Sequence, residues 1–235
     1  KQEAWEYAQI QECDTVIALM QQEEKNIIAC QIISQSYKTA LSICNIGSNY
    51  YPMRSALFNN NSTTQHVTLS AAHLTSLKLQ QMLQHQHCEE VITSSTEQFC
   101  VLSIKLSSDA AILGNKLNSL TEHLDKQATL IGVYRDNILQ EDKELIFKEN
   151  DSIIIAQAQH LDNSITYSIT GKHNPYQEVM IAGGSDIAIC LLANIYTKYA
   201  ITLIEPSLAI AEKIATLYPD ITVIHGNIND DNLLV

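Results

Sequence analysis

The chain has 235 residues, of which 46% are hydrophobic and 17% charged, so it can bury a core and is not predicted to be disordered. Its formal net charge is −12, from 26 acidic against 14 basic residues, which argues against binding nucleic acid or an anionic membrane surface through bulk electrostatics. No apolar run approaches the roughly 18–20 residues that span a bilayer. At about 100–150 residues per domain, one large or two small domains are expected.

The cysteines and the chain ends point to a piece of a protein from a reducing compartment. The six cysteines have no CxxC pair, and several lie in apolar runs, as Cys30 does, which is typical of free thiols in a core. His85-Gln86-His87-Cys88 lacks a fourth ligand at a standard spacing, so a solvated loop is favoured over a metal site. Because the chain begins with Lys1 and ends on an apolar Leu233-Leu234-Val235, we expect a fragment.

The first stretch, residues 1–85, alternates predicted strands with predicted helices. Strands are predicted at Thr15–Met20, Ala40–Ile46 and His66–Leu69, and helices at Glu23–Ser36, shortly after Pro52, and from Ser70 to about Gln84, with a polar loop at Asn59–Thr64. Strands that alternate with helices indicate βαβ units and a parallel sheet.

The second stretch, residues 90–161, has more strands and fewer helices. Strands are predicted at Phe99–Leu106, Thr129–Tyr134, Ile138–Gln140 and Asp151–Gln157, with a short helix at Lys116–Leu124 and a turn at Arg135-Asp136-Asn137. Asparagine tolerates the positive φ that such a turn needs. This pattern predicts a small α+β unit, and a polar linker is predicted at residues 162–177.

The third stretch, residues 178–235, returns to the α/β pattern. Strands are predicted at Val179–Ala182, Ala200–Ile204 and Ile221–Ile224, and helices at Asp186–Lys198 and Leu208–Leu217. The predicted fold class of the whole chain is therefore α/β, with two parallel-sheet halves flanking the small α+β unit.

A glycine turn joins the first strand of the third stretch to its helix. The turn and first helical residues read Gly183-Gly184-Ser185-Asp186-Ile187-Ala188, and Glu205 follows 22 residues after Gly183, at the end of the next strand. In a dinucleotide fold, helix N-terminal amides bind the pyrophosphate and the acid binds ribose hydroxyls. Ser185 replaces the middle glycine and adds a Cβ where the phosphate approaches, whereas Ala188 still allows close helix–strand packing.

The sequence lacks the motifs of the common hydrolases and kinases. It contains no nucleophile elbow, P-loop or His-Asp-Ser arrangement. Its acidic clusters, such as Glu23-Glu24 and Glu141-Asp142, fall on predicted helix and turn surfaces, where a solvated face is the simpler interpretation. We therefore do not expect an enzyme.

The order of several short motifs points to a family. In the third stretch these are Val179–Ile187, Leu203–Pro206 and Val223–Asp230; in the second, Leu113–Leu117, Gly132–Asn137 and Asn150–Ile155; in the first, Asp14–Met20, Glu24–Asn26 and Ala29-Cys30. Together they resemble the TrkA-type potassium uptake regulators, which carry tandem RCK nucleotide-binding and RCK C-terminal domains. The resemblance covers essentially the whole chain.

The resemblance implies a domain order. Residues 1–85 would be the second half of a Rossmann-like RCK nucleotide-binding domain, and 90–161 an RCK C-terminal domain. Residues 162–177 would be a linker, and 178–235 the first half of a second Rossmann-like nucleotide-binding domain. Two departures from the family pattern are Met20-Gln21, where Thr-Asp is common, and Cys44 or Asn45, where an arginine is common.

The resemblance also implies a function. A family member would be a cytosolic regulatory subunit that forms homo-oligomers and docks on the inner face of a membrane potassium transporter subunit of the TrkH or TrkG type. NAD(H), with ATP or ADP as further candidates, would bind in the Rossmann-like cleft and gate K⁺ transport. Gly183, Ser185 and Ala188 would face the phosphates and Glu205 the ribose, while Asn227 stands where the family usually has an aspartate near the adenine.

Two other interpretations stay open. The chain could be a fragment of an NAD-dependent oxidoreductase, which would need a catalytic residue after the cofactor fold. It could instead be a scaffold whose nucleotide cleft has decayed. A small-molecule sensor site in the second stretch is a further alternative, although no charge constellation there indicates one.

Overall fold

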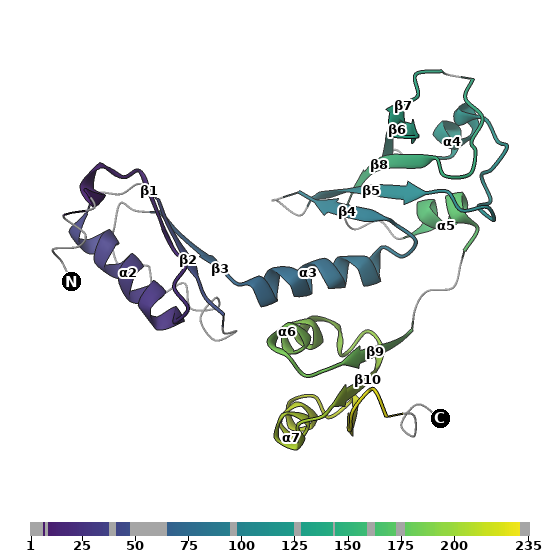
Figure 1. Ribbon diagram of the computed structural model, residues 1–235. Coiled ribbons are helices and arrows are strands. Elements are labelled where there is room, and N and C mark those ends of the chain that lie inside the picture. Colours follow the sequence, from purple (N-terminus) through teal and green to yellow (C-terminus); the bar gives the residue numbers. More distant parts are fainter. Residues whose placement is uncertain are drawn as a thin grey trace. The chain divides into compact units, whose positions relative to one another are not determined.

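The computed structural model describes residues 7, 9–37, 41–47, 65–94, 98–124, 128–142, 144–158, 163–172 and 177–230. Residue contacts divide the chain into two compact units, one formed by residues 1–78 together with 178–235 and one by residues 79–177. The described strands form three separate sheets, two of three strands and one of five (Figure 1).

The N-terminal sheet is parallel and is built from βα units. A short 3-10 helix, η1 (Ile10–Glu12), precedes β1 (Thr15–Ala18), α2 (Glu23–Ser36), β2 (Leu41–Asn45), β3 (Gln65–Leu69) and α3 (Ala71–Gln84). The strands lie in the order β1-β2-β3, and both pairings are parallel. Helix α2 buries Ile27, Cys30 and Ile33, so a small apolar core forms between this helix and the sheet.

The middle sheet is antiparallel and has five strands in the order β4-β5-β8-β6-β7. Its strands are β4 (Glu90–Thr93), β5 (Phe99–Lys105), β6 (Ala128–Arg135), β7 (Ile138–Leu139) and β8 (Ser152–Ala158), and its helices are α4 (Leu117–His123) and α5 (Ser164–Thr170). Every second residue of β5 and β8 is buried, because successive side chains of a strand point to opposite faces of the sheet.

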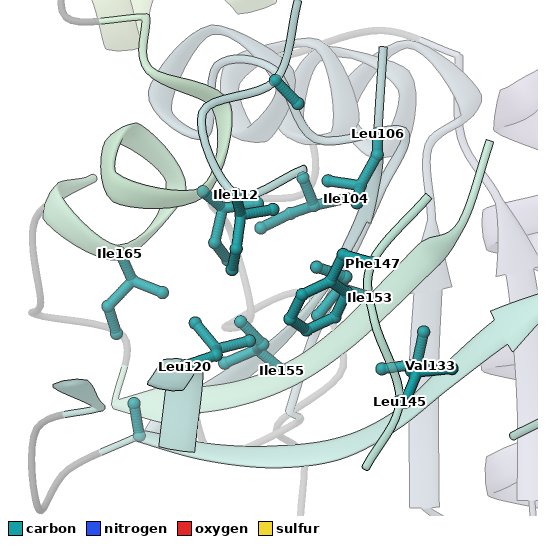
Figure 2. Packing of buried hydrophobic residues seen from close by; sticks show 13 residues of the cluster. Ile104, Leu106, Ile112, Leu120, Val133, Leu145, Phe147, Ile153, Ile155 and Ile165 are labelled. Atoms are coloured by element: carbon teal, nitrogen blue, oxygen red, sulfur yellow. The ribbon is translucent and has the colours of Figure 1, made fainter. Parts of the chain in front are cut away.

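The buried face of the middle sheet carries the largest core described here. Ile104, Val133, Ile153 and Ile155 project from the strands, and Phe147 packs among them from the segment before β8 (Figure 2). Helices α4 and α5 close this core with Leu120, Ile165 and Ile169. The packing makes the described residues between 98 and 170 a folded α+β body rather than a set of loops.

The C-terminal sheet is a parallel βαβαβ unit. It contains β9 (Glu178–Ala182), α6 (Asp186–Ile195), β10 (Ala200–Glu205), α7 (Leu208–Leu217) and β11 (Thr222–His225). The strand order is β11-β10-β9, with β10 in the centre. This is the arrangement of one mononucleotide-binding half of a Rossmann fold, whose ligand sites lie at the carboxyl ends of the strands.

The predicted fold class is confirmed, and most predicted elements are present. The α/β architecture has two parallel halves and an antiparallel α+β body. One prediction was wrong: Ser164–Thr170, within the predicted linker, is helix α5, and it buries Ile165 and Ile169. Strand β4 was not predicted at all. The helix expected after Pro52 and the loop at Asn59–Thr64 lie outside the described residues.

Within the described part of the chain, no helix has both the length and the apolar character needed to cross a bilayer.

Candidate functional site

The glycine turn leaves the carboxyl end of β9 and enters α6. Gly183 has φ +95°, a region that side chains rarely adopt, and a Cβ built on it would meet no atom within 4 Å. Its N–H donates to the carbonyl of Ile204 (2.8 Å), which ties the turn to β10. The space beside Gly183 is therefore open, as the approach of a phosphate requires.

Gly184 is closely packed by side chains of α7 and by the Glu205 carboxylate. A Cβ at this position would lie 2.6 Å from Cδ1 of Ile214, 2.7 Å from Cγ2 of Ile210 and 3.1 Å from Oε2 of Glu205. Only glycine allows α7 and the Glu205 carboxylate to approach the turn so closely. This glycine therefore serves close packing, whereas Gly183 serves the positive φ.

Ser185 is the N-cap of α6. Its hydroxyl accepts a hydrogen bond from the N–H of Ala188 (3.5 Å), so one of the amides that a phosphate would use is already capped by the protein. Asp186 and Ile187 are exposed in the first turn, and Ala188 is buried against the sheet. The Asp186 carboxylate favours the positive end of the helix dipole but adds negative charge beside the turn.

Glu205 lies at the end of β10 and is only 6% exposed. One carboxylate oxygen, Oε2, accepts a hydrogen bond from the N–H of Gly184 (2.5 Å), and the other, Oε1, accepts one from the N–H of Ser207 (2.7 Å). This acid therefore holds the glycine turn and the start of α7 together. Each oxygen of an ionised carboxylate has room for a further donor, so ribose hydroxyls could still be accepted.

Asn227 follows β11 in an exposed turn. Its side-chain Oδ1 accepts a hydrogen bond from the N–H of Asn229 (3.0 Å), and its carbonyl accepts one from Asp230 (2.9 Å). Gly226 donates to the carbonyl of Glu205 (3.0 Å), so this turn adjoins the end of β10. Parallel pairing thus brings the turns at Gly183, Glu205 and Asn227 to one edge of one sheet.

This edge has the chemistry to hold a nucleotide. The N–H groups of Gly183 and Gly184 donate to the carbonyl of Ile204 and the carboxylate of Glu205, so a phosphate in the open space beside Gly183 would be held by the amides at the start of α6. Glu205 offers acceptors for ribose hydroxyls. The capping hydroxyl of Ser185 and the charge of Asp186 work against phosphate binding at the same turn. The residues fit a nucleotide better on the ribose side than on the pyrophosphate side.

A buried asparagine, Asn26, which the sequence indicated only as part of the Glu24–Asn26 motif, organises the corresponding edge of the N-terminal sheet. Asn26 is fully buried; its amide nitrogen donates to the carbonyls of Met20 and Asn45 (2.9 Å each), and its Oδ1 accepts from the N–H of Met20 (2.7 Å). It joins the segments that follow β1 and β2. The position of an asparagine in the first turn of an amphipathic helix was the available signal, because a buried amide needs several partners.

Known proteins share both the sequence pattern and the fold. No family model matches the sequence. The potassium uptake protein TrkA of Vibrio alginolyticus is 23% identical over 228 residues, which cover 95% of this chain and 50% of that protein. TrkA of Haemophilus influenzae is 22% identical over 227 residues, covering 95% and 49%. The chain is similar to TrkA over almost its whole length. It spans about half the length of the TrkA relatives that it matches.

Solved structures add the fold. A GsuK channel bound to NAD matches 94% of this chain and 38% of its own, with a TM-score of 0.55 and 15% sequence identity. A second structure of the GsuK channel matches equally well, at 14% identity. Both chains are much longer than the TrkA-like chain, and at these identities the likeness shows the fold alone.

In the middle domain, the motif residues Arg135 and Asp151 form an ion pair in which the aspartate is fully buried. Nε and Nη2 of Arg135 donate to the two carboxylate oxygens of Asp151 (2.7 and 2.8 Å), and the N–H of Lys148 donates to Asp151 as well (2.8 Å). Burial alone would raise the pKa of Asp151, but the hydrogen bonds from Arg135 and Lys148 outweigh it, so its pKa lies below the usual value. These contacts tie β6 to the segment that leads into β8.

The middle domain has a polar groove and a buried histidine outside this ion pair. A polar groove of about 550 Å³ lies on the side of the sheet that includes Glu89, Lys105, Tyr134 and Asp136; its mixed charges select no ligand class, so a sensor site there stays a prediction. Among the residues that the structure describes, no group of three His, Cys, Asp or Glu side chains could hold a metal ion. His85 is buried in this domain, and its Nδ1 has no hydrogen-bond partner.

Proposed function

We propose that this chain is part of a regulatory subunit of a potassium uptake system, and that it binds NAD(H) or an adenine nucleotide at its C-terminal sheet. The observation that carries the proposal is the buried Glu205 carboxylate beneath the open turn at Gly183. The sequence similarity to TrkA supports the link to potassium uptake, and the fold shared with an NAD-bound GsuK channel supports the ligand class.

The same proposal assigns the parts of the chain. Residues 1–85 and 178–235 are the second and first halves of two RCK nucleotide-binding domains, and residues 90–161, with helix α5 packed on them, are an RCK C-terminal domain. The subunit would act from the cytosol as a homo-oligomer on a TrkH- or TrkG-like membrane partner, without catalysing a reaction. A nucleotide would gate K⁺ transport only to the extent that its affinity differs between two conformations of the regulator.

The ligand would contact residues of the C-terminal sheet alone. The proposed binding residues are Gly183, Gly184, Ser185, Asp186, Ile187, Ala188, Glu205 and Asn227. Backbone amides at the start of α6 would hold the phosphates beside the glycine turn, Glu205 would orient the ribose, and Asn227 would lie on the adenine side. Because Ser185 and Asp186 oppose the phosphates, we expect modest affinity for the pyrophosphate of NAD.

Calorimetric titration of NADH, NAD and ATP into the purified chain tests the proposal. We expect saturable binding in the micromolar range, about −8 kcal/mol for a Kd near 1 μM. The mass in solution, recorded alongside, shows whether binding accompanies an oligomer. Absence of binding to the folded chain, and also to the full-length protein, would favour a scaffold with a decayed cleft and would overturn the nucleotide proposal.

Replacing Ser185 with glycine is expected to raise the affinity for NADH about tenfold, or about 1.4 kcal/mol. The substitution removes the Cβ from the phosphate side and frees the N–H of Ala188 from its cap. Adenosine, which has no phosphate, is the matched control ligand, and its affinity should stay unchanged. Equal gains for NADH and adenosine, or no gain for NADH, would contradict this role for Ser185.

A further inference from the structure

The end of helix α3 and the start of helix α5 are bonded to each other in the middle domain. The amide nitrogen of Asn163, directly before α5, donates to the carbonyl of Gln84, the last residue of α3 (2.6 Å). A second hydrogen bond joins the Cys88 sulfur to the Thr166 hydroxyl of α5 (3.9 Å). Since α3 precedes the strands of the middle sheet and α5 follows them (Figure 1), these bonds connect the segments through which the chain enters and leaves the domain.

The joint, which we define as residues 84–88 and 163–166, is packed into the interior of the middle domain. Thr166 is 1% exposed, and Ile169 of the same helix lies in the large core. Cys88 packs against that core and also against the smaller apolar cluster of β4 and β5. A polar group buried in the joint is therefore kept from water and depends on protein partners.

His85 lies in the joint, between the residues that make its two hydrogen bonds. It is 7% exposed, and its ring nitrogen Nδ1 has no hydrogen-bond partner. A neutral imidazole carries its proton on only one ring nitrogen, so the ring fits this place with Nδ1 unprotonated. Protonation would add a charge and a second N–H donor at Nδ1, where no group among the described residues accepts it.

The ionisable groups near the joint do not favour a charged His85. Burial lowers the pKa of His85, although a hydrogen bond with Asn163 acts in the opposite direction, and no carboxylate among the described residues contributes. Glu89 and Glu90 are exposed, and burial raises the pKa of Cys88 to about 11. The ionisable side chains on the elements of the joint and next to them are His73, Lys78, His87, Cys88, Glu89, Glu90, Cys100, Tyr167 and Lys172.

We propose that His85 makes the joint a pH-sensitive device, which holds α5 on the middle domain at neutral pH and loosens it in acid. The sign follows from the buried ring. Because the pKa of His85 is lowered in the folded state, the opened joint binds the proton more tightly than the closed joint does. The closed joint therefore keeps its full stability above the ordinary histidine pKa of about 6.5. It loses stability as the pH falls from there towards the lowered folded-state pKa.

Opening of the joint would free both ends of the middle domain together. Gln84 ends the helix that leads into the domain, and Asn163 precedes the helix that leads out of it. The five-stranded sheet has its own ladders of hydrogen bonds, so α5 can open without unfolding of the sheet, as separate cooperative units do. The joint thus gives the chain a proton-dependent transition that requires no nucleotide.

Hydrogen exchange of the whole chain at two pH values tests the proposal. After correction for the intrinsic pH dependence of exchange, protection of α5 is expected to fall by up to about tenfold between about pH 7.5 and about pH 5.5. Uptake of one proton by an open-state imidazole with a pKa of about 6.5 changes the opening constant by that factor. Peptides from β10, which lies in the C-terminal sheet, should keep their protection. Protection of α5 that does not change with pH would overturn the proposal.

Two variants separate His85 from the other histidines. His85→Gln cannot titrate, so protection of α5 should no longer depend on pH in this range. His73→Gln removes an exposed histidine from the same helix, and it should keep the wild-type dependence. The same pH dependence in folded His85→Gln as in the wild type would rule out His85 as the sensor.

A measurement on the wild type covers the case in which His85→Gln does not fold. Deuterium exchange at the imidazole C2 position, read residue by residue with tandem mass spectrometry, gives the pKa of each histidine in the native chain. We expect a pKa for His85 below the ordinary value of about 6.5. A pKa at or above that value would overturn the proposal, because the closed joint would then bind the proton at least as tightly as the open joint does.

Discussion

Replacing Asp151 with asparagine is expected to destabilise the middle domain by about 3 kcal/mol, the lower end for breaking a buried ion pair. Asp151 has no exposed side-chain surface, and Arg135 keeps 26% of its own. The amide would offer one acceptor where the carboxylate serves both nitrogens of Arg135 and the N–H of Lys148. The cost comes from leaving the guanidinium without its charge partner.

Hydrogen exchange of peptides from β6 and β8 measures this effect where it arises, since the chain has more than one folded unit. The matched control is Glu144→Gln, which breaks the exposed pair with Lys116; exposed pairs contribute little, so exchange should stay as in the wild type. Similar protection in the Asp151→Asn variant and the wild type would refute the structural role of the buried pair.

The same pair predicts a pH dependence. The pKa of Asp151 is lowered in the folded state. Its contribution to the stability of the fold is therefore fully present above the pKa of an unfolded aspartate, about 3.9. The contribution is lost as the pH falls from there through the lowered folded-state pKa. The difference in unfolding free energy between the wild type and Asp151→Asn, measured at a series of pH values, should therefore shrink over that window. A difference that stays constant would contradict the assignment.

Replacing Glu205 with glutamine is expected to weaken nucleotide binding about 10- to 100-fold, the value of a charge-assisted hydrogen bond. Glutamine keeps one acceptor oxygen, but its NH₂ group cannot accept from Gly184 or Ser207, each of which now has its own carboxylate oxygen. The glycine turn would loosen, and the ribose acceptors would lose their charge.

Titration of NADH and ATP into this variant measures the loss, and circular dichroism checks that the C-terminal sheet is folded. Glu212→Gln is the matched control, because Glu212 is an exposed acid on α7 in the same half. If folded Glu205→Gln binds NADH and ATP as tightly as the wild type, Glu205 is not part of the ligand site. The glycine turn would then remain the only proposed contact to the phosphates.

Local sequence was enough to predict those elements whose residue pattern agrees with the way they pack. Helix α7 runs from Leu208 to Leu217, the range predicted, because it follows a strand and a Pro-Ser turn and ends before a Pro-Asp turn. Helix α5 was missed, because Ser164–Thr170 is rich in Ser, Thr and Ile, which favour strands and turns when exposed. The segment is helical in the structure because a helix buries both Ile165 and Ile169 in the core of the middle domain.

Strand β4 is a second element that local sequence did not predict. Glu90–Thr93 has four residues and only one of them, Val91, is fully buried, so its local pattern is too short to indicate a strand. Pairing with β5 supplies the hydrogen bonds that make it one. The identity of a short edge strand depends on its neighbour, which the segment itself does not specify.

The sequence by itself determined the α/β class, the order of the elements and the placement of a glycine turn and an acid on neighbouring strands, because these follow from local periodicity and turn chemistry. Only the tertiary structure decided what the polar groups do. Both oxygens of Glu205 accept hydrogen bonds from backbone amides, Ser185 caps a helix, and Cys30 and Cys44 are buried in one apolar cluster. Hydrogen-bond partners and burial depend on contacts between distant segments, and these are set by how helices pack on sheets.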